Sequence, residues 1–235
     1  MNKYYENLKF IKEKVTNYLT EIFKVYGNEL LLRLEEYNLL ENPDNCIETS
    51  TSIGFIIEEF ITSKLAIYTS THNNKDEIVI KKLKGKSTTN SSYDCYANYK
   101  DIFVLINIKV QKKGSNNNAV ASINILHNNY VLENPSQPKA YLVLKTLYDF
   151  GTSNKDGQRK IIIKGISNYF LEEIDFSSGH KQDHRNWKEN FNASSGRLQV
   201  PAMWKNTHLL NVNSISYSKT KEFIDDIYNG RNPEI

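Results

Sequence analysis

The sequence is poor in the residues that mark several specialised classes of protein. It has only two cysteines, Cys46 and Cys95, in unrelated contexts, which exclude a cysteine zinc cluster and give no reason to expect a disulfide. No apolar run is long enough to span a bilayer, and residues 1–26 mix acidic and basic groups where a signal peptide would have an apolar core. These absences predict a cytoplasmic protein without a membrane partner.

The composition suits one folded domain. The chain has 235 residues, of which 39% are hydrophobic and 24% charged, as in an ordinary globular protein with one substantial core. The net charge of +3 permits a polyanionic partner but does not require one. We expect a single domain over residues 1–235, with an N-terminal helical region at 1–45, a core at 50–175 and a final segment at 176–235.

Apolar spacing and turn signals predict the order of the secondary structure. The expected elements are helices at 3–26, 28–41 and 54–65, two strands within 93–110, a helix at 119–131, strands at 139–148 and 159–166, a short helix at 167–174, a strand at 197–200 and a helix at 219–230. This order is typical of an α/β fold with a mixed central sheet flanked by helices. The apolar stripe of the first helix predicts either core packing or a contact between subunits.

Residues 93–110, YDCYANYKDIFVLINIKV, are the most informative stretch. In the second of its two strands, alternation predicts one wholly apolar face and an opposite face that ends in Asn107 and Lys109. Polar residues two positions apart are unusual at the end of an apolar strand, because burial alone would favour apolar side chains there. Together with Asp94 on the preceding strand, they supply the minimal groups for metal-assisted hydrolysis of a phosphodiester.

These residues, in this order and spacing, resemble the motif of type II restriction endonucleases of the PD-(D/E)xK superfamily, and the HincII/HpaI group most closely. Asp94 takes the place of the first acid, and Asn107-Ile108-Lys109 that of the acid-x-Lys triplet. Gly54 and Glu58 match a Gly-x-x-x-Glu on the helix before the motif. Further segments resemble the helix after the motif, a later strand and helix, the segment that reads bases and the terminal helix; they are 118–131, 156–174, 192–200 and 220–228.

The resemblance implies a restriction-endonuclease-like core that binds Mg²⁺, for which Mn²⁺ can substitute. It implies hydrolysis of both strands of a short palindromic duplex site, with 5′-phosphate ends, by a homodimer. It further implies a bacterial restriction-modification system in which a DNA methyltransferase is the genetic partner. The segment 176–235 would then contain the DNA-recognition segment and the C-terminal helix.

Within this resemblance each site residue has an expected role. Asp94 and Asn107 are expected to bind the metal, Asn107 through its uncharged amide oxygen. Lys109 is expected to hold the attacking water and to offset negative charge in the transition state. Glu58 would compensate for the missing carboxylate at position 107. Each of the three charged residues also has an alternative interpretation without a catalytic role. Asp94 can be a turn aspartate, Lys109 a solvated lysine at a strand end and Glu58 a surface glutamate on a helix.

The amide at position 107 is the main departure from the family pattern, and it leaves three explanations open. A natural enzyme can use an amide there, which we favour; the chain can be an engineered inactive variant; or it can belong to a lineage that binds DNA without cutting it. A repair nuclease that selects DNA structure instead of sequence is a further alternative for the same fold.

Polar side chains near the motif and in the final segment are candidate DNA contacts. Basic residues suit phosphates, whereas amides, small hydroxyl residues and arginine suit base edges. The candidates are Gln111, Lys112, Lys113, Asn116, Asn117, Asn118, Lys181, Arg185, Asn192, Ser194, Ser195 and Arg197.

Overall fold

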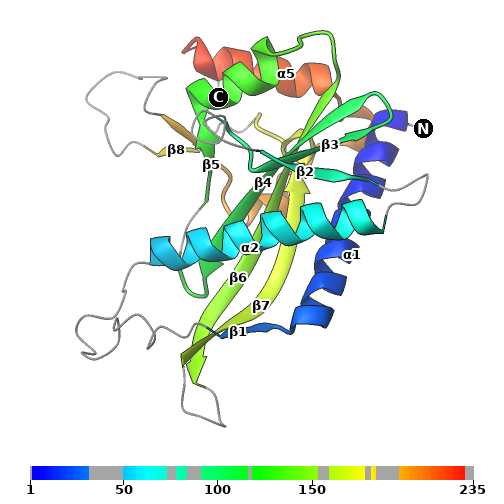
Figure 1. Ribbon diagram of the computed structural model, residues 1–235. Helices are drawn as coiled ribbons and strands as arrows, with labels where there is room; N and C mark the ends of the chain where they lie inside the picture. Colours follow the sequence, from blue (N-terminus) through cyan, green and yellow to red (C-terminus); the bar gives the residue numbers. More distant parts are fainter. Residues whose placement is uncertain are drawn as a thin grey trace.

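A six-stranded mixed sheet forms the centre of the molecule in the computed structural model, shown in Figure 1. The structure describes residues 2–31, 50–72, 78–83, 91–115, 118–152, 159–177, 181–183 and 196–230. The strand order is β1 (Glu29–Leu31), β7 (Arg159–Phe170), β6 (Lys139–Thr152), β4 (Ile102–Lys112), β3 (Cys95–Tyr99) and β2 (Ile80–Lys82). Only β4 and β6 pair in parallel among these strands; the other pairs are antiparallel.

Helices cover both faces of the sheet, which confirms the expected α/β fold class. On one face, α1 (Lys3–Tyr26) and α2 (Ser50–Thr71) pack against the even-numbered side chains of β4, such as Ile106. On the other face lie α3 (Ile123–His127), the π-helix η4 (Asn128–Leu132) and α5 (Tyr217–Tyr228), which pack against odd-numbered ones, such as Leu105. Period-2 alternation along an apolar strand therefore builds two cores from one sequence run.

The apolar stripe of α1 lies inside the core of the single chain. Leu8, Ile11, Val15 and Leu19 are all 0% exposed, in one cluster with side chains of α2 and the sheet. Of the two interpretations of this stripe, core packing is confirmed, and these four side chains are not available to a second subunit. None of the helices in the described ranges is both long and apolar enough to cross a bilayer.

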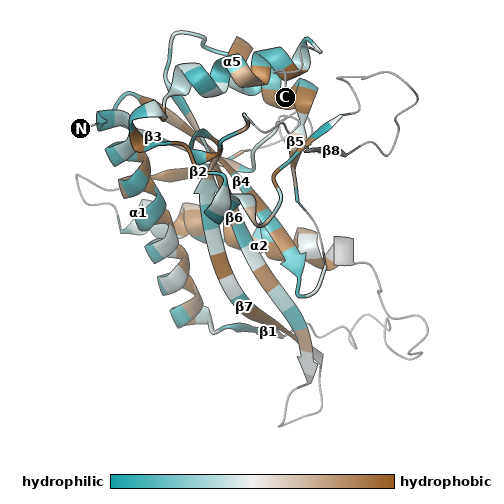
Figure 2. Ribbon diagram, turned by 180° about the vertical axis from the view of Figure 1, so that it is seen from behind, coloured by the Kyte–Doolittle hydropathy of each residue, from teal (hydrophilic) through white to brown (hydrophobic). Residues whose placement is uncertain are grey.

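A second, three-stranded sheet is attached to the same core. It contains β5 (Ala119–Ser122), β9 (Arg197–Gln199) and β8 (Lys181–Asp183) in that order, all antiparallel. Figures 1 and 2, seen from opposite sides, both place this small sheet on the side of the molecule away from α1. The expected strand at 197–200 is thereby confirmed over Arg197–Gln199.

Three expected helical stretches form strands where a distant partner takes their backbone hydrogen bonds. Residues 29–31 pair with β7, residues 119–122 pair with β9, and residues 167–170 continue β7 along β6. The remainder of the expected helix at 28–41 lies outside the described residues. The described residues also include three short connecting elements; they are η5 (Leu171–Glu173), α4 (Trp204–Thr207) and η6 (Val212–Ser214).

Candidate active site

The candidate site forms where β4 loses its neighbour β3. The antiparallel pairing of these strands ends at Cys95 opposite Ile106, whereas β4 continues to Lys112. On this edge the backbone N–H groups beyond Ile106 need other acceptors, because an unpaired N–H is costly away from water. A carboxylate accepts from one of them, and a second acid lies close to the same short stretch of β4.

Asp94 is the first of these acids. Its own backbone N–H donates to the carbonyl of Ile106 at 2.9 Å, and its Oδ2 accepts from the backbone N–H of Ile108 at 2.6 Å. This bond holds the carboxylate over the residue that stands between Asn107 and Lys109. Burial raises the pKa of Asp94, while Lys109 and the Ile108 hydrogen bond lower it.

Glu58 reaches the same stretch from helix α2. Burial raises the pKa of its carboxyl to about 7; the Lys109 cation lowers it, the charge of Asp94 raises it, and a hydrogen bond from the Val110 backbone lowers it. Asp94 thus bonds the backbone of β4 at Ile108, and the Glu58 carboxyl lies near the backbone of Val110, with Lys109 between these positions. The structure places Glu58, Asp94 and Lys109 within electrostatic reach of one another.

The arrangement suits a hard divalent cation with few protein ligands. Burial raises the pKa of both carboxyls. A nearby cation would lower both pKa values, because it stabilises the charged forms. Mg²⁺ keeps several waters and needs only one or two carboxylates beside the substrate. The described residues contain no group of three or more His, Cys, Asp or Glu side chains placed around a common point. A further protein ligand among these residues would be an amide or a carbonyl oxygen.

Asn107, next to Ile108 on β4, supplies an amide, and two hydrogen bonds fix its orientation. Its Nδ2 donates to the carbonyl of Val120 at 2.8 Å and to the hydroxyl of Tyr141 at 2.7 Å. The Tyr141 hydroxyl in turn donates to the carbonyl of Ser92. A backbone carbonyl can only accept, so the nitrogen must face Val120, and Oδ1 points away from both partners.

Burial decreases along the odd-numbered face of β4. Leu105 is 0% exposed and Asn107 2% exposed, whereas Lys109 and Gln111 are half-buried. The candidate site thus lies at the margin of the second core, where polar side chains begin to meet solvent.

Two residues near the site have no counterpart among the predictions. Tyr141 holds Asn107 from β6, a contact 34 positions apart in the sequence that no local pattern announces. Lys145 pairs in register with Lys109 across the parallel strands, and burial followed by the charge of Lys205 lowers its pKa to about 8. A lysine within the apolar run AYLVLKTLY carries the same signal that drew attention to Lys109.

The four described candidate DNA contacts at and after the end of β4 are half-buried or exposed. Gln111 is half-buried and donates to the carbonyl of Ser115, and Lys112 lies over the ring of Phe150. Lys113 is exposed, and the half-buried Asn118 accepts a bond from Val200 through its carbonyl.

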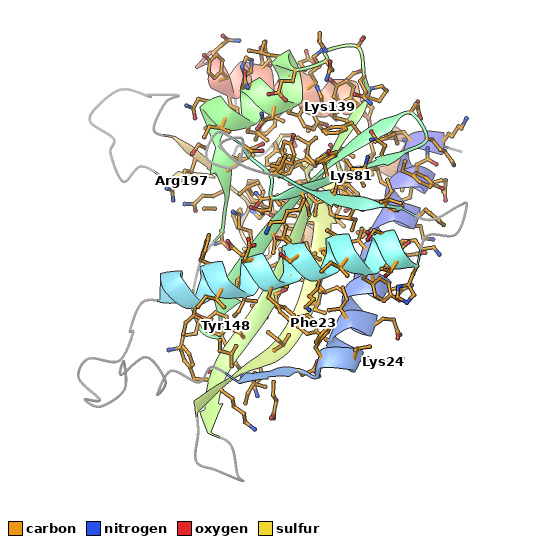
Figure 3. All side chains as sticks on the ribbon, in the orientation of Figure 1. Phe23, Lys24, Lys81, Lys139, Tyr148 and Arg197 are labelled. Atoms are coloured by element: carbon orange, nitrogen blue, oxygen red, sulfur yellow. The ribbon has the colours of Figure 1, made fainter. Side chains whose placement is uncertain are left out.

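The candidate contacts in the final segment are only partly described. Arg197 is exposed on β9, on the side of the molecule away from α1 (Figure 3). Lys181 begins β8, in register with Gln199. The other candidates lie outside the described residues; they are Asn116, Asn117, Arg185, Asn192, Ser194 and Ser195.

Comparison with protein-family models gave no match, and comparison with curated proteins gave none. Among solved structures, the chain is similar to the NlaIV restriction endonuclease, with 12% sequence identity and a TM-score of 0.45. The alignment covers 95% of this chain and 90% of that chain. A likeness this distant carries no argument about function, and the closer resemblance to the HincII/HpaI group stays a prediction.

Proposed function

We propose that the protein is a metal-dependent nuclease that hydrolyses phosphodiester bonds in duplex DNA at specific sites, as a type II restriction endonuclease does. One observation carries the proposal. Where the pairing of β3 with β4 ends, Asp94 and Glu58 lie within electrostatic reach of Lys109, beside an oriented amide. Phosphodiester hydrolysis needs an activated water and neutralisation of charge on the phosphoryl oxygens, and this set of groups suits both tasks.

Each residue has a defined part in this proposal. Asp94, Glu58 and the Oδ1 of Asn107 would hold Mg²⁺, with Mn²⁺ as a substitute. The ion would supply Lewis acidity and lower the pKa of a bound water. Lys109 would orient the attacking water by hydrogen bonding and would offset negative charge on the phosphoryl group.

The small sheet would connect recognition of the DNA sequence to hydrolysis of the phosphodiester bond. The carbonyl of Val120 on β5 bonds Asn107, and Ser122 on the same strand pairs with the exposed Arg197 on β9. An arginine here would suit guanine in the major groove, whereas Lys112 and Lys113 would suit phosphates. A palindromic target would be met by a homodimer, and a methyltransferase acting on the same site would protect the host DNA.

Digestion of a fully sequenced phage genome tests the proposal. The purified full chain is incubated with the DNA in Mg²⁺, in Mn²⁺ and in EDTA, and the fragments are resolved and their ends sequenced. We expect discrete fragments with 5′-phosphate ends in both metals and intact DNA in EDTA.

Two other outcomes would replace this function with its alternatives. Sequence-specific binding without cleavage in either metal would identify a non-cleaving DNA-binding protein, an option that Asn107 keeps open. Cleavage restricted to branched or frayed substrates would identify a structure-selective nuclease. Either result overturns the proposal.

A further inference from the structure

We infer that Tyr141 is a positioning residue that orients the Asn107 amide for metal binding. The inference rests on the proposed function and goes beyond it by explaining why an amide stands at position 107. Tyr141 is 0% exposed on β6, in register with Leu105 of β4, and its hydroxyl accepts a hydrogen bond from Asn107.

The hydrogen-bond directions around Asn107 leave one arrangement. The Tyr141 hydroxyl donates its single proton to the carbonyl of Ser92, so it can only accept a hydrogen bond from Asn107. The Val120 carbonyl also only accepts. Two acceptors facing one side chain require a group with two N–H donors, and the amide nitrogen meets this requirement. An aspartate would place a carboxylate oxygen against the Val120 carbonyl, with no proton between them.

A second chain of contacts keeps the Ser92 carbonyl in place. The backbone N–H of Ser92 donates to Oδ1 of Asn129 at 2.8 Å, and Nδ2 of Asn129 donates to Glu133 at 3.0 Å. Tyr141 therefore connects Asn107 to the segment that leads into Asp94. Two of the three proposed oxygen ligands, Asp94 and Asn107, are thus linked through one set of hydrogen bonds.

The same geometry explains the neutral ligand. A side chain that is 2% exposed cannot easily carry a charge before the metal binds. An amide with both N–H groups bonded is stable there in the metal-free protein and leaves its oxygen free to coordinate. Groups that orient a metal ligand typically change metal affinity by about 10- to 100-fold when they are removed.

Mn²⁺ binding to the DNA-free protein tests the inference, with the free ion measured by electron paramagnetic resonance. We expect Tyr141→Phe to bind Mn²⁺ about tenfold more weakly than the wild type, because the Asn107 amide loses one of its two hydrogen bonds. The matched control is Tyr130→Phe, which also removes the hydroxyl of a fully buried tyrosine, one that bonds Glu172 and not Asn107. It should leave Mn²⁺ affinity unchanged.

The results distinguish a positioning role of Tyr141 from a general destabilisation of the fold. They also distinguish failure of this inference from failure of the proposed function. Equal Mn²⁺ affinity for Tyr141→Phe and the wild type overturns the inference, as does an equal loss in Tyr130→Phe. If Tyr141→Phe does not fold, Tyr141→His replaces it. One ring nitrogen can donate to Ser92 and the other can accept from Asn107, so we expect an Mn²⁺ affinity close to that of the wild type, and a tenfold loss overturns the inference. A wild type that cleaves no DNA overturns the proposed function but leaves this comparison valid, whereas one that binds no Mn²⁺ overturns both.

Discussion

Glu58 gives the candidate site a pH dependence near neutrality. Burial raises the pKa of its carboxyl to about 7, so a proton competes with a metal ion for this side chain below that pH. We expect Mn²⁺ affinity to fall as the pH decreases from 8 to 6, and Glu58→Gln to bind the ion weakly with a flatter pH profile. Glu222→Gln on α5, an exposed site, should follow the wild type.

The same shift predicts how Glu58 affects stability without metal. Its pKa in the folded protein lies above the ordinary value of 4.5, so the proton binds the folded state more tightly. The wild type should gain stability relative to Glu58→Gln as the pH falls from about 7 to about 4.5. Thermal melting in EDTA measures this difference, and a gain with rising pH would contradict the assignment.

The sequence alone predicted the residues of the candidate site but not what orients them. A polar pair interrupts an apolar strand and an acid precedes it, so the sequence pattern was enough to predict Asp94, Asn107 and Lys109. Asn107 looked like a defect in a metal site, since its sequence context gives no sign of Val120 or Tyr141. Their contacts with it depend on the register of β6 and on the path of β5, which are properties of the tertiary structure.

Among the elements, α1 shows how burial assigns an apolar stripe. Leu19 is 0% exposed in the shared core, whereas Val25 on the same helix is 74% exposed. We expect Leu19→Ala to lower the free energy of unfolding by about 2–5 kcal/mol, because it removes packed methyl groups and leaves a cavity. Val25→Ala should stay within about 0.5 kcal/mol of the wild type. Chemical denaturation measures both; equal effects would mean that α1 does not pack as described.

Elements with strong periodicity were predictable, and those fixed by distant pairing were not. The helices α1, α2 and α5 and the strands β3, β4 and β6 follow from apolar spacing within each segment. In contrast, 119–122 and 167–170 form strands because β9 and β6 accept their backbone hydrogen bonds. Local apolar content cannot distinguish these short runs from helix.

At the scale of the whole molecule, the site lies at the junction of the two sheets. The large sheet supplies Asp94, Asn107 and Lys109, α2 supplies Glu58, and β5 of the small sheet supplies the carbonyl that holds Asn107. Lys109, at the margin of the second core, is half-buried, and Arg197 on the small sheet is exposed. Under the proposed function, a duplex bound across the small sheet would place its backbone beside the carboxylates.

The most direct test of this account is the cleavage of duplex DNA by Lys109→Ala, compared with the wild type and with Lys219→Ala. Lys219 is exposed on α5, so its replacement removes one positive charge away from the site. We expect Lys109→Ala to lose cleavage in Mg²⁺ while it still binds the specific DNA in Ca²⁺, and Lys219→Ala to cut like the wild type. Cutting by Lys109→Ala at a rate close to that of the wild type would contradict the assignment of the active site.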